Sequence, residues 1–256
     1  MDYLSGVSRE LIPMITSSFE KDIIRHAESL PNEEVCGFVL FDERKVAYAK
    51  EMCNISFNKH ESFAIDPITY LKHKFGENLL GIYHSHPKSD ETPSDADLSN
   101  AKELGIPYLI YSVQTKKFFL HYPPTYEPCD YIGRPYVKGF YECTSIPRDY
   151  YKNEKGLNFS NWGDNYWPPD DDKTTNDKVL NILTSRGRKV NFKDIQEGDV
   201  ILFRIGSRIH CGVYTGDGDF LHQMVGKFSG KDPLSTKYQK YIHAIYRYNE
   251  NDVLTK

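Results

Sequence analysis

Two histidines, a serine and an aspartate stand close together in the stretch GIYHSHPKSDETPSDAD. His84 and His86 are two residues apart, and Ser94 and Asp97 follow at a spacing of three. Because side chains two apart on a strand point to the same face, both imidazoles can reach one ion. Two neutral nitrogens and a carboxylate oxygen suit Zn²⁺ and leave a fourth position for water. The stretch therefore predicts a metal site with an open coordination position.

Hydrolysis at such a metal also requires a side chain that accepts and returns protons. The acidic pair Glu33-Glu34 stands just before an apolar segment and supplies two carboxylates. The two residues are adjacent, so their side chains would face opposite sides of a strand. From the residues alone, either of them is a candidate for the base.

A second chemistry centres on Cys143 in the other half of the chain. This cysteine follows a glycine-bearing loop and precedes an expected helix, whose dipole and free N–H groups would favour a thiolate. His210 lies in RIHCGVY, and His222 lies in the next expected strand. Nucleophilic acyl transfer requires a cysteine, a histidine that takes its proton and a polar group that orients the histidine. These three residues predict a cysteine hydrolase site.

The turn between these two strands decides whether the histidines can cooperate. A two-residue turn would place His222 opposite Val213 and leave His210 on the other face of the sheet. A three-residue loop, residues 216–218, would place His222 opposite Gly212 and bring both histidines to one face. The predicted triad therefore requires the three-residue loop.

Each constellation also has a simpler interpretation. A His-x-His pair alone is more often two satisfied polar residues at a strand end, and a lone cysteine is more often an inert buried thiol. The spaced serine and aspartate in the first case, and the histidine pair in the second, favour function. The chain has five cysteines, an odd number that argues against a disulfide framework. Four of them are expected as small buried hydrophobes: Cys36, Cys53, Cys129 and Cys211.

The composition describes a globular chain with room for two ordinary domains. Of 256 residues, 39% are hydrophobic, with 19 Tyr and 14 Phe, so each half can close a core. The net charge of −4 gives no basic footprint, and nucleic acid is not expected as a partner. No apolar run is long enough for a membrane span, and the N-terminus lacks the pattern of a signal peptide. We therefore expect a soluble product made in the cytoplasm.

The elements that must position these residues alternate in the first half. The segment 17–31 has an apolar face at helical spacing, formed by Ile23, Ile24, Ala27 and Leu30. Thr92, followed by Pro93 and the acid Asp95, is typical of the cap and first turn of a further helix. Strands are expected at 35–41, 45–53, 79–84, 107–113 and 117–122, with a short helix at 66–75.

The second half begins after the proline-rich segment HYPPTYEP, where we place the domain boundary. A helix ending at Gly156 is expected after Cys143, and Pro147 indicates that it begins one or two residues late or bends. The polar, aromatic segment 158–172, with Trp162 and Trp167, is expected as a surface loop. A helix near 176–186 and strands at 199–205, 208–215, 219–224 and 243–248 would complete a small antiparallel sheet.

The first constellation, together with Glu34-Val-Cys-Gly, resembles the JAMM metalloprotease motif of the MPN fold. His84-Ser-His86-Pro, seven residues, Ser94, two residues and Asp97 fill every ligand position of that motif. The resemblance implies a cytidine-deaminase-like α/β/α domain in which His84, His86 and Asp97 hold Zn²⁺. It also implies that Glu34 is the general acid and base, and that Ser94 supports the oxyanion of the tetrahedral intermediate.

The second half resembles the NlpC class of papain-like peptidoglycan hydrolases. The resemblance rests on the motifs GRPY at 133–136, Glu142-Cys143, GDVILF at 198–203, HCGVY from His210 and GDFLH ending at His222. It implies a papain-like α+β domain in which Cys143 is the nucleophile, His210 the base and His222 the orienting residue. Cys143 would also supply an oxyanion-hole N–H, with Tyr136 as a candidate helper. Glu142 departs from the family pattern, which has aspartate there.

The two resemblances divide the chain into α/β residues 1–122, a linker at 123–128 and α+β residues 129–256. This order, with Arg148-Asp149-Tyr150-Tyr151 after the cysteine, is similar to that of tail tip assembly proteins of lambda-like siphophages. Such a protein would be made in the host cytoplasm and act from the virion tail tip in the periplasm or cell wall. Its partners would be phage tail tip proteins and host peptidoglycan stem peptides.

Two other interpretations remain open. The chain can be a structural tail tip component whose metal and thiol sites serve folding or assembly only. It can also be a cellular JAMM-type isopeptidase, which would leave the cysteine half unexplained.

Overall fold

The computed structural model describes residues 19–76, 78–128, 130–159, 172–184 and 187–249. The chain divides into two compact units, and among the described residues the division falls between Glu127 and Pro128. Most of the loop expected at 158–172, both tryptophans and Cys129 lie outside the described residues. The two units are described separately.

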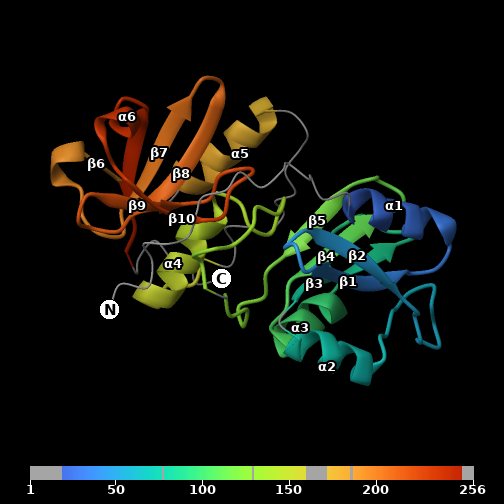
Figure 1. The fold of residues 1–256 in the computed structure, drawn as a ribbon. Coiled ribbons are helices and arrows are strands. Elements are labelled where there is room, and N and C mark those ends of the chain that lie inside the picture. Colours follow the sequence, from blue (N-terminus) through green and yellow to red (C-terminus); the bar gives the residue numbers. More distant parts are fainter. Residues whose placement is uncertain (1–18, 77, 129, 160–171, 185–186, 250–256) are drawn as a thin grey trace. The chain divides into compact units, whose positions relative to one another are not determined.

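The first unit is a five-stranded sheet between helices, with strand order β2-β1-β3-β4-β5. Neighbouring strands are antiparallel except β3 and β4, which are parallel. Figure 1 shows α1 on one face and α2 and α3 on the other, which is the predicted α/β/α layering. The elements are α1 (Phe19–Ser29), β1 (Cys36–Phe41), β2 (Ala47–Met52), α2 (Pro67–Phe75), β3 (Leu79–His86), α3 (Asp95–Leu104), β4 (Tyr108–Ser112) and β5 (Phe118–His121).

Helix α1 buries Phe19, Ile23 and Ala27 against the sheet. Leu30 was expected on this apolar face, and that prediction is wrong because its side chain is 47% exposed. The helix ends at Ser29, and Leu30 already belongs to a turn in which its carbonyl accepts a hydrogen bond from the Glu33 N–H. The helical spacing therefore holds only as far as the helix itself.

Strand β1 passes so close to its neighbours that Gly37 has no room for a side chain. A Cβ there would lie 2.3 Å from Lys50 O on β2 and 2.5 Å from the Tyr83 ring on β3. The buried Tyr83 is in turn hydrogen-bonded from α1, where His26 Nδ1 lies 2.9 Å from its hydroxyl. The glycine thus lets a large aromatic ring lie across the sheet under α1.

Helix α3 begins two residues later than expected. Ser94, not Thr92, is the N-cap, and the acid at the third helical position is Asp97 rather than Asp95. Ser94 Oγ accepts from the Asp97 N–H at 3.2 Å, while the Asp97 carboxylate accepts from the Ser94 N–H at 2.8 Å. This reciprocal capping box starts the helix, and the backbone N–H of Thr92 is bonded to Asp90 instead.

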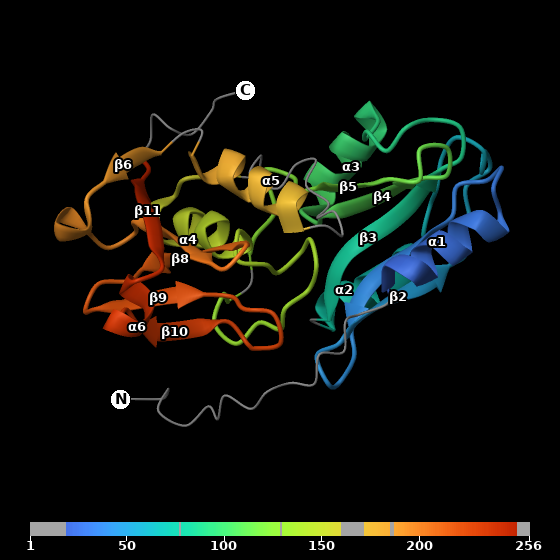
Figure 2. The same ribbon diagram turned by 90° about the horizontal axis from the view of Figure 1, so that it is seen from above.

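The second unit is a six-stranded antiparallel sheet with strand order β10-β9-β8-β7-β11-β6. Figure 2, seen from above, shows α4 and α5 next to β8, and both helices contact that strand. The elements are α4 (Ser145–Lys155), α5 (Asp172–Thr184), β6 (Arg188–Val190), the 3-10 helix η2 (Phe192–Asp194), β7 (Val200–Ile205), β8 (Arg208–Tyr214), β9 (Asp219–His222), β10 (Gly230–Pro233), α6 (Thr236–Gln239) and β11 (Ile242–Arg247). Strands β6 and β10 were not predicted from the sequence.

Helix α4 starts at Ser145, two residues after Cys143, and ends at Gly156 in a left-handed conformation. Pro147 therefore falls in the first turn, where its missing N–H has no intrahelical partner to lose. The late start that the proline indicated is confirmed. Cys143 lies just outside the helix, in the turn where the Ser145 N–H donates to Glu142 O.

The cysteines expected to be buried differ in outcome. Cys36 and Cys211 are fully buried, but Cys53 is exposed because it lies one residue beyond the end of β2.

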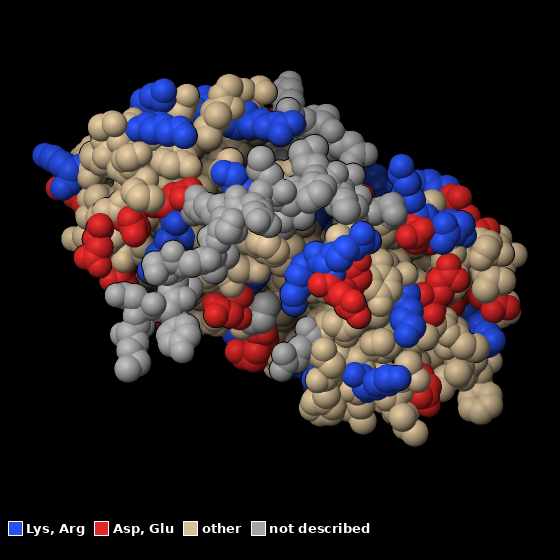
Figure 3. All heavy atoms as spheres, in the orientation of Figure 1, with Lys and Arg blue, Asp and Glu red and all other residues tan. Residues whose placement is uncertain are grey.

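On the face in Figure 3, acidic and basic side chains lie side by side over the first unit. In the same unit, Lys116 and Glu28 form an ion pair at 2.8 Å. Within the described residues, no helix has the length and apolar character needed to cross a membrane.

Candidate active sites

The end of β3 meets the start of α3 at the predicted metal site. His84 and His86 project from β3, and their Nε2 atoms lie 3.2 Å apart. Asp97 completes the group, with Oδ1 3.2 Å from His84 Nε2 and Oδ2 3.5 Å from His86 Nε2. All three residues are buried. The structure therefore brings together the three residues that the sequence predicted as ligands.

These separations fit one metal ion. Ligand atoms held tetrahedrally at about 2.1 Å from Zn²⁺ lie roughly 3.4 Å from one another. The nitrogen–nitrogen distance is 3.2 Å, each nitrogen lies 3.2–3.5 Å from one of the two Asp97 carboxylate oxygens, and one ligand atom from each residue lies within 4.8 Å of the other two. Two imidazoles and one carboxylate are also a donor set that Zn²⁺ accepts with a position left open. The residues present fit the ion by geometry and by chemistry.

The surroundings prepare the ligands for a cation. The His84 ring stacks on Phe63 at 4.5 Å, and burial lowers the pKa of His84, which keeps the imidazole neutral. His86 Nδ1 lies 2.7 Å from Asp90 O, which fixes a tautomer with Nε2 free to bind. Burial opposes ionisation of Asp97, but hydrogen bonds with both histidines and Ser94 lower its pKa overall. Burial lowers the pKa of His86, but its hydrogen bonds with Asp97 and Asp90 raise it overall, so a bound cation would displace a proton from this ring.

Ser94 lies next to the ligand group, as the resemblance to the JAMM motif predicts, but its hydroxyl also has a structural role. Ser94 Oγ donates to Asp97 Oδ2 at 2.6 Å, and the Ser94 N–H donates to the same oxygen. The serine therefore orients the aspartate and caps α3. With Thr92 expected as the cap, Ser94 would have been inside the helix, whereas it is the residue before the helix.

Glu34 lies immediately before β1, beside the end of β3. The neighbouring residue Val35 is bonded to Ser85 in both directions, by its N–H to Ser85 Oγ and by its carbonyl to the Ser85 N–H. Burial raises the pKa of Glu34 to about 7, with the charge of His86 opposing and that of Asp97 adding to the shift. Glu34 thus lies within electrostatic reach of the ligand group, with a pKa suited to a proton carrier near neutral pH.

In the second unit, strand register brings the two predicted histidines together. His222 pairs with Gly212, the register that the three-residue loop predicts. Gly216, Asp217 and Gly218 all have positive φ, and the backbone of the loop closes between Thr215 and Asp219. As a result, His210 Nε2 lies 2.9 Å from His222 Nδ1.

Cys143 approaches β8 at an edge that β9 does not cover, because β9 pairs only with residues 212–214. The thiol and backbone N–H of Cys211 and the side chain of His210 all favour the thiolate form of Cys143. The Cys211 thiol is the strongest influence, burial opposes it, and the net effect lowers the pKa of Cys143 well below its usual value. His210 therefore interacts with the nucleophile and is also hydrogen-bonded to the orienting histidine.

Two residues of this site were not found from the sequence. Cys211 was expected as an inert hydrophobe, yet its thiol also lies 3.1 Å from Cys143 O. Asp232, on the unpredicted strand β10, lies with Oδ2 2.9 Å from His222 Nε2. Its segment GKDP has no strand periodicity, and only pairing with β9 carries it to the histidine.

Glu142, which departs from the family pattern, is buried beside Cys143. Its Oε1 accepts from the Gly139 N–H at 2.9 Å and from the Tyr136 hydroxyl at 3.2 Å. Burial is the main cause that raises the pKa of Glu142 to about 7. Tyr136, the candidate oxyanion helper, is thus bonded to Glu142.

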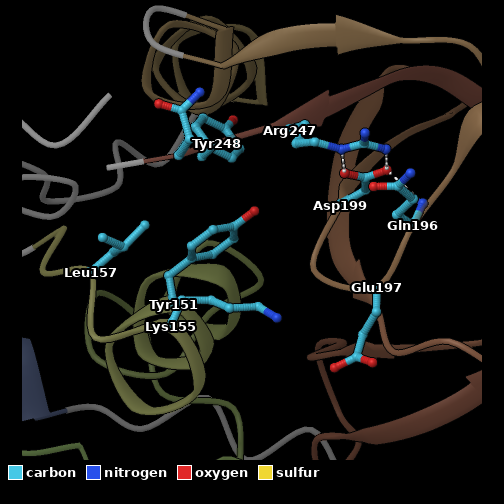
Figure 4. Close-up of a pocket in the computed structure, with 9 residues that line it drawn as sticks. Tyr151, Lys155, Leu157, Gln196, Glu197, Asp199, Arg247 and Tyr248 are labelled. Carbon is cyan, nitrogen blue, oxygen red and sulfur yellow. Dashed lines mark hydrogen bonds and ion pairs between the residues drawn. The ribbon is translucent and has the colours of Figure 1, made fainter. Parts of the chain in front are cut away.

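A separate pocket of about 480 Å³ lies in the second unit (Figure 4). None of the predicted catalytic residues lines it. Asp199 and Arg247 form a bidentate ion pair on one wall, at 2.7 and 2.8 Å, and Tyr151 donates to Gly198 O at 2.7 Å. The Gly198-Asp199 part of the family motif therefore joins β7 to β11 and α4. The lining residues are Tyr151, Lys155, Leu157, Gln196, Glu197, Asp199, Arg247, Tyr248 and Asn249.

Comparison with known proteins gives both units a family. The model of prokaryotic homologs of the JAB domain matches residues 16–122, and that of the NlpC/P60 family matches residues 133–247. The first is an MPN domain, so the predicted fold classes and their order are confirmed. JAB/MPN domains typically bind zinc, and the two families together indicate peptidase or hydrolase activity.

Individual relatives match either most of the chain or about a third of it. Tail tip assembly protein K of Escherichia phage N15 is 23% identical over 241 residues, which is 89% of this chain and 93% of that protein. Tail tip assembly protein K of Escherichia phage lambda is 24% identical over 189 residues, 72% of this chain and 89% of that protein. Desampylase of Haloferax volcanii is 35% identical over 89 residues, 32% of this chain and 64% of that protein. The chain thus consists of a JAB domain followed by an NlpC/P60 domain and is similar along most of its length to tail tip assembly protein K.

Proposed function

We propose that the protein is a phage tail tip component with two peptidase sites. Its NlpC/P60 domain would cleave an amide bond in peptidoglycan stem peptides, and its JAB domain would cleave a peptide or isopeptide bond in a protein partner. One observation supports this most strongly. His210 is hydrogen-bonded to His222 and contributes to the lowered pKa of Cys143.

In the cysteine site, each residue has one task. His210 takes the proton of Cys143, and the sulfur attacks the carbonyl carbon of the scissile amide. His222 holds His210 in place through the 2.9 Å hydrogen bond. His210 then returns the proton to the leaving amine, and a water molecule hydrolyses the thioester with His210 again as the base. The backbone N–H of Cys143 is the proposed oxyanion donor.

In the JAB site, His84, His86 and Asp97 would hold Zn²⁺, which supplies a Lewis acid and lowers the pKa of water. Glu34, with a pKa of about 7, would accept a proton from the attacking water and pass it to the leaving amine. Ser94 would support the oxyanion of the intermediate if its hydroxyl, which here donates to Asp97 Oδ2, turned to the substrate.

The names of the N15 and lambda relatives support a place at the tail tip. The partners would then be other tail tip proteins and host peptidoglycan, and the site of action would be the periplasm or cell wall. The protein would reach that position as part of the virion, after synthesis in the host cytoplasm.

The test is incubation of the purified full chain with sacculi, followed by chromatography and mass spectrometry of released muropeptides. Wild-type protein and His84→Ala should release the same stem-peptide fragments, and Cys143→Ala should release none. Intact sacculi after incubation with the wild type would refute the peptidoglycan substrate. Equal release by wild type and Cys143→Ala would refute the cysteine mechanism.

A further inference from the structure

The hydrogen bond between His210 and His222 is followed by a second one, from His222 to a fourth residue, Asp232. His222 uses both ring nitrogens: Nδ1 lies 2.9 Å from His210 Nε2, and Nε2 lies 2.9 Å from Asp232 Oδ2. We propose that Asp232 is a positioning residue that fixes the tautomer of His222 and thereby the direction in which protons move through the site. This inference rests on the proposed cysteine peptidase function.

The argument follows from the number of protons that two neutral imidazoles carry. Each ring has one N–H, so only one proton can lie between His210 Nε2 and His222 Nδ1. If Asp232 is ionised, it can only accept, and His222 must place its proton on Nε2. His222 Nδ1 is then bare and accepts from His210 Nε2–H, which leaves His210 Nδ1 bare.

The bare nitrogen of His210 is the one that can serve Cys143. His210 Nε2 is engaged with His222, and His210 also lowers the pKa of Cys143, so Nδ1 is the nitrogen left to take the thiol proton. A base must present a lone pair to the proton that it removes. If His222 carried its proton on Nδ1 instead, His210 would hold its own proton on Nδ1 and could not act as the base. Asp232 excludes that arrangement.

The aspartate is built firmly into the fold. Asp232 and His222 are 7% and 4% exposed, so the bond between them is shielded from water. Asp232 pairs with Phe220 across β9, and the Tyr238 hydroxyl of α6 donates to Asp232 Oδ2 at 3.0 Å. A second donor on the same oxygen favours the ionised carboxylate.

Titratable groups on three neighbouring elements face His222. His210 faces it from β8, Asp232 from β10 and Tyr238 from α6, where the ring centroids of His222 and Tyr238 lie 6.1 Å apart. The Phe220 ring covers a further side at 4.5 Å. The Asp232 carboxylate contacts the His222 ring directly.

The first measurement requires no variant. The full chain labelled with ¹⁵N-histidine should show, by long-range ¹⁵N–¹H correlation near pH 7, His222 protonated at Nε2 and bare at Nδ1, and His210 protonated at Nε2. A further proton on His210 Nδ1 would be the one taken from Cys143. Assignment would use the loss of single signals in His210→Gln and His222→Gln. A wild-type His222 protonated at Nδ1 would overturn the proposal.

The second measurement follows the nucleophile itself. Alkylation of Cys143 by iodoacetamide between pH 5 and 9, quantified by mass spectrometry of its peptide, should be slowed at least about tenfold near pH 6.5 in Asp232→Ala. Asp232→Asn keeps an uncharged acceptor and should lie between that variant and the wild type. A matched control is Asp219→Ala, the same change on the neighbouring strand, which should leave the profile within about twofold.

A superimposable pH profile for Asp232→Ala and wild type would also overturn the proposal. Circular dichroism melting of each variant shows whether it is folded, and the wild-type tautomer decides the question if Asp232→Ala is not. Neither readout uses peptidoglycan. Intact sacculi with the predicted tautomers and profiles would therefore refute the proposed substrate alone.

Discussion

The two sites of this chain are assembled in opposite ways. In the JAB domain, the three ligands come from one strand end and the first turn of the next helix, and the carboxylate of Glu34 joins them from the segment before β1. In the NlpC/P60 domain, Cys143, His210, His222 and Asp232 come from four separate segments. The first site depends mainly on local structure, and the second depends on how strands pair. Each should therefore fail under a different kind of change.

The edge of β8 illustrates the second kind of assembly. Residues 208–211 of β8 do not pair with β9. Beside them, the Asn176 side chain of α5 accepts from the Ile209 N–H at 2.7 Å and donates to Ser207 O. Cys143 meets the same edge at Cys211. Helix α5, the segment that carries Cys143 and strand β8 must therefore all be packed correctly before the Cys143 thiol lies near His210.

The largest effect is expected from removing one residue of β9 between the loop 216–218 and His222. Deletion of Leu221 would place His222 opposite Val213 and turn it away from His210, because a shift of one residue reverses the face of a strand. Peptidoglycan hydrolysis should fall at least about 1000-fold. The control is deletion of Asp217, which shortens the loop to two residues but leaves Thr215 opposite Asp219 and His222 opposite Gly212. Full activity after the deletion of Leu221 would mean that a bulge can restore the register.

The next effect belongs to the JAB site and tests a single ligand. Asp97→Asn removes the anionic donor and should weaken Zn²⁺ binding at least about 100-fold, since even changes beyond the direct ligands cost up to that much. Competition with a chelating dye measures the affinity, and Asp95→Asn, an exposed acid in the same turn, is the matched control. Unchanged affinity in Asp97→Asn would show that the ion is held elsewhere.

Thiol reactivity against pH gives a smaller but direct test of the cysteine site. A lowered pKa means that Cys143 is already a thiolate at a pH where an ordinary thiol is protonated. At pH 6, iodoacetamide should therefore react with Cys143 about ten times faster than with the exposed Cys53 of the same chain. In His210→Ala the pKa should rise and this advantage should shrink. Equal rates for the two cysteines in the wild type would contradict the assigned nucleophile.

The smallest effect is expected at the cap of α3. Ser94→Ala removes the cap and should cost about 1 kcal/mol of the free energy of unfolding. Zinc affinity should fall roughly tenfold, because Asp97 loses the hydroxyl that orients it. Thermal denaturation measures the first change and dye competition the second. Thr92→Ala, which alters the residue first expected as the cap, should change neither.

The same contrast explains what the sequence could predict. The ligands His84, His86 and Asp97 lie within one short stretch, so strand alternation and helix capping were enough to place them. His210 and His222 required a statement about loop length, and that statement was sufficient because β-sheet pairing has a period of two. Both fold classes followed from motifs and from alternating hydrophobic patterns.

What the sequence missed depends on contacts between distant segments. Asp232 lies in a short strand with proline at its end, and nothing in GKDP marks it as a partner of a histidine. Cys211 looks like any buried thiol of a strand, and only the approach of Cys143 gives it a role. The start of α3 was misplaced because two residues near it can cap a helix, and the carboxylate of Asp97 decides between them.

Gly37 shows that residues of one motif can be present for different physical reasons. In Glu34-Val-Cys-Gly, the acid is proposed to carry protons, whereas the glycine is present because Lys50 O and the Tyr83 ring leave no space for a side chain. A descendant of this chain that lost its ligands would be free to replace Glu34, but it would keep Gly37 for as long as it kept the sheet. Among distant relatives, the glycine would therefore mark common ancestry, and only the acid and the ligands would mark retained catalysis.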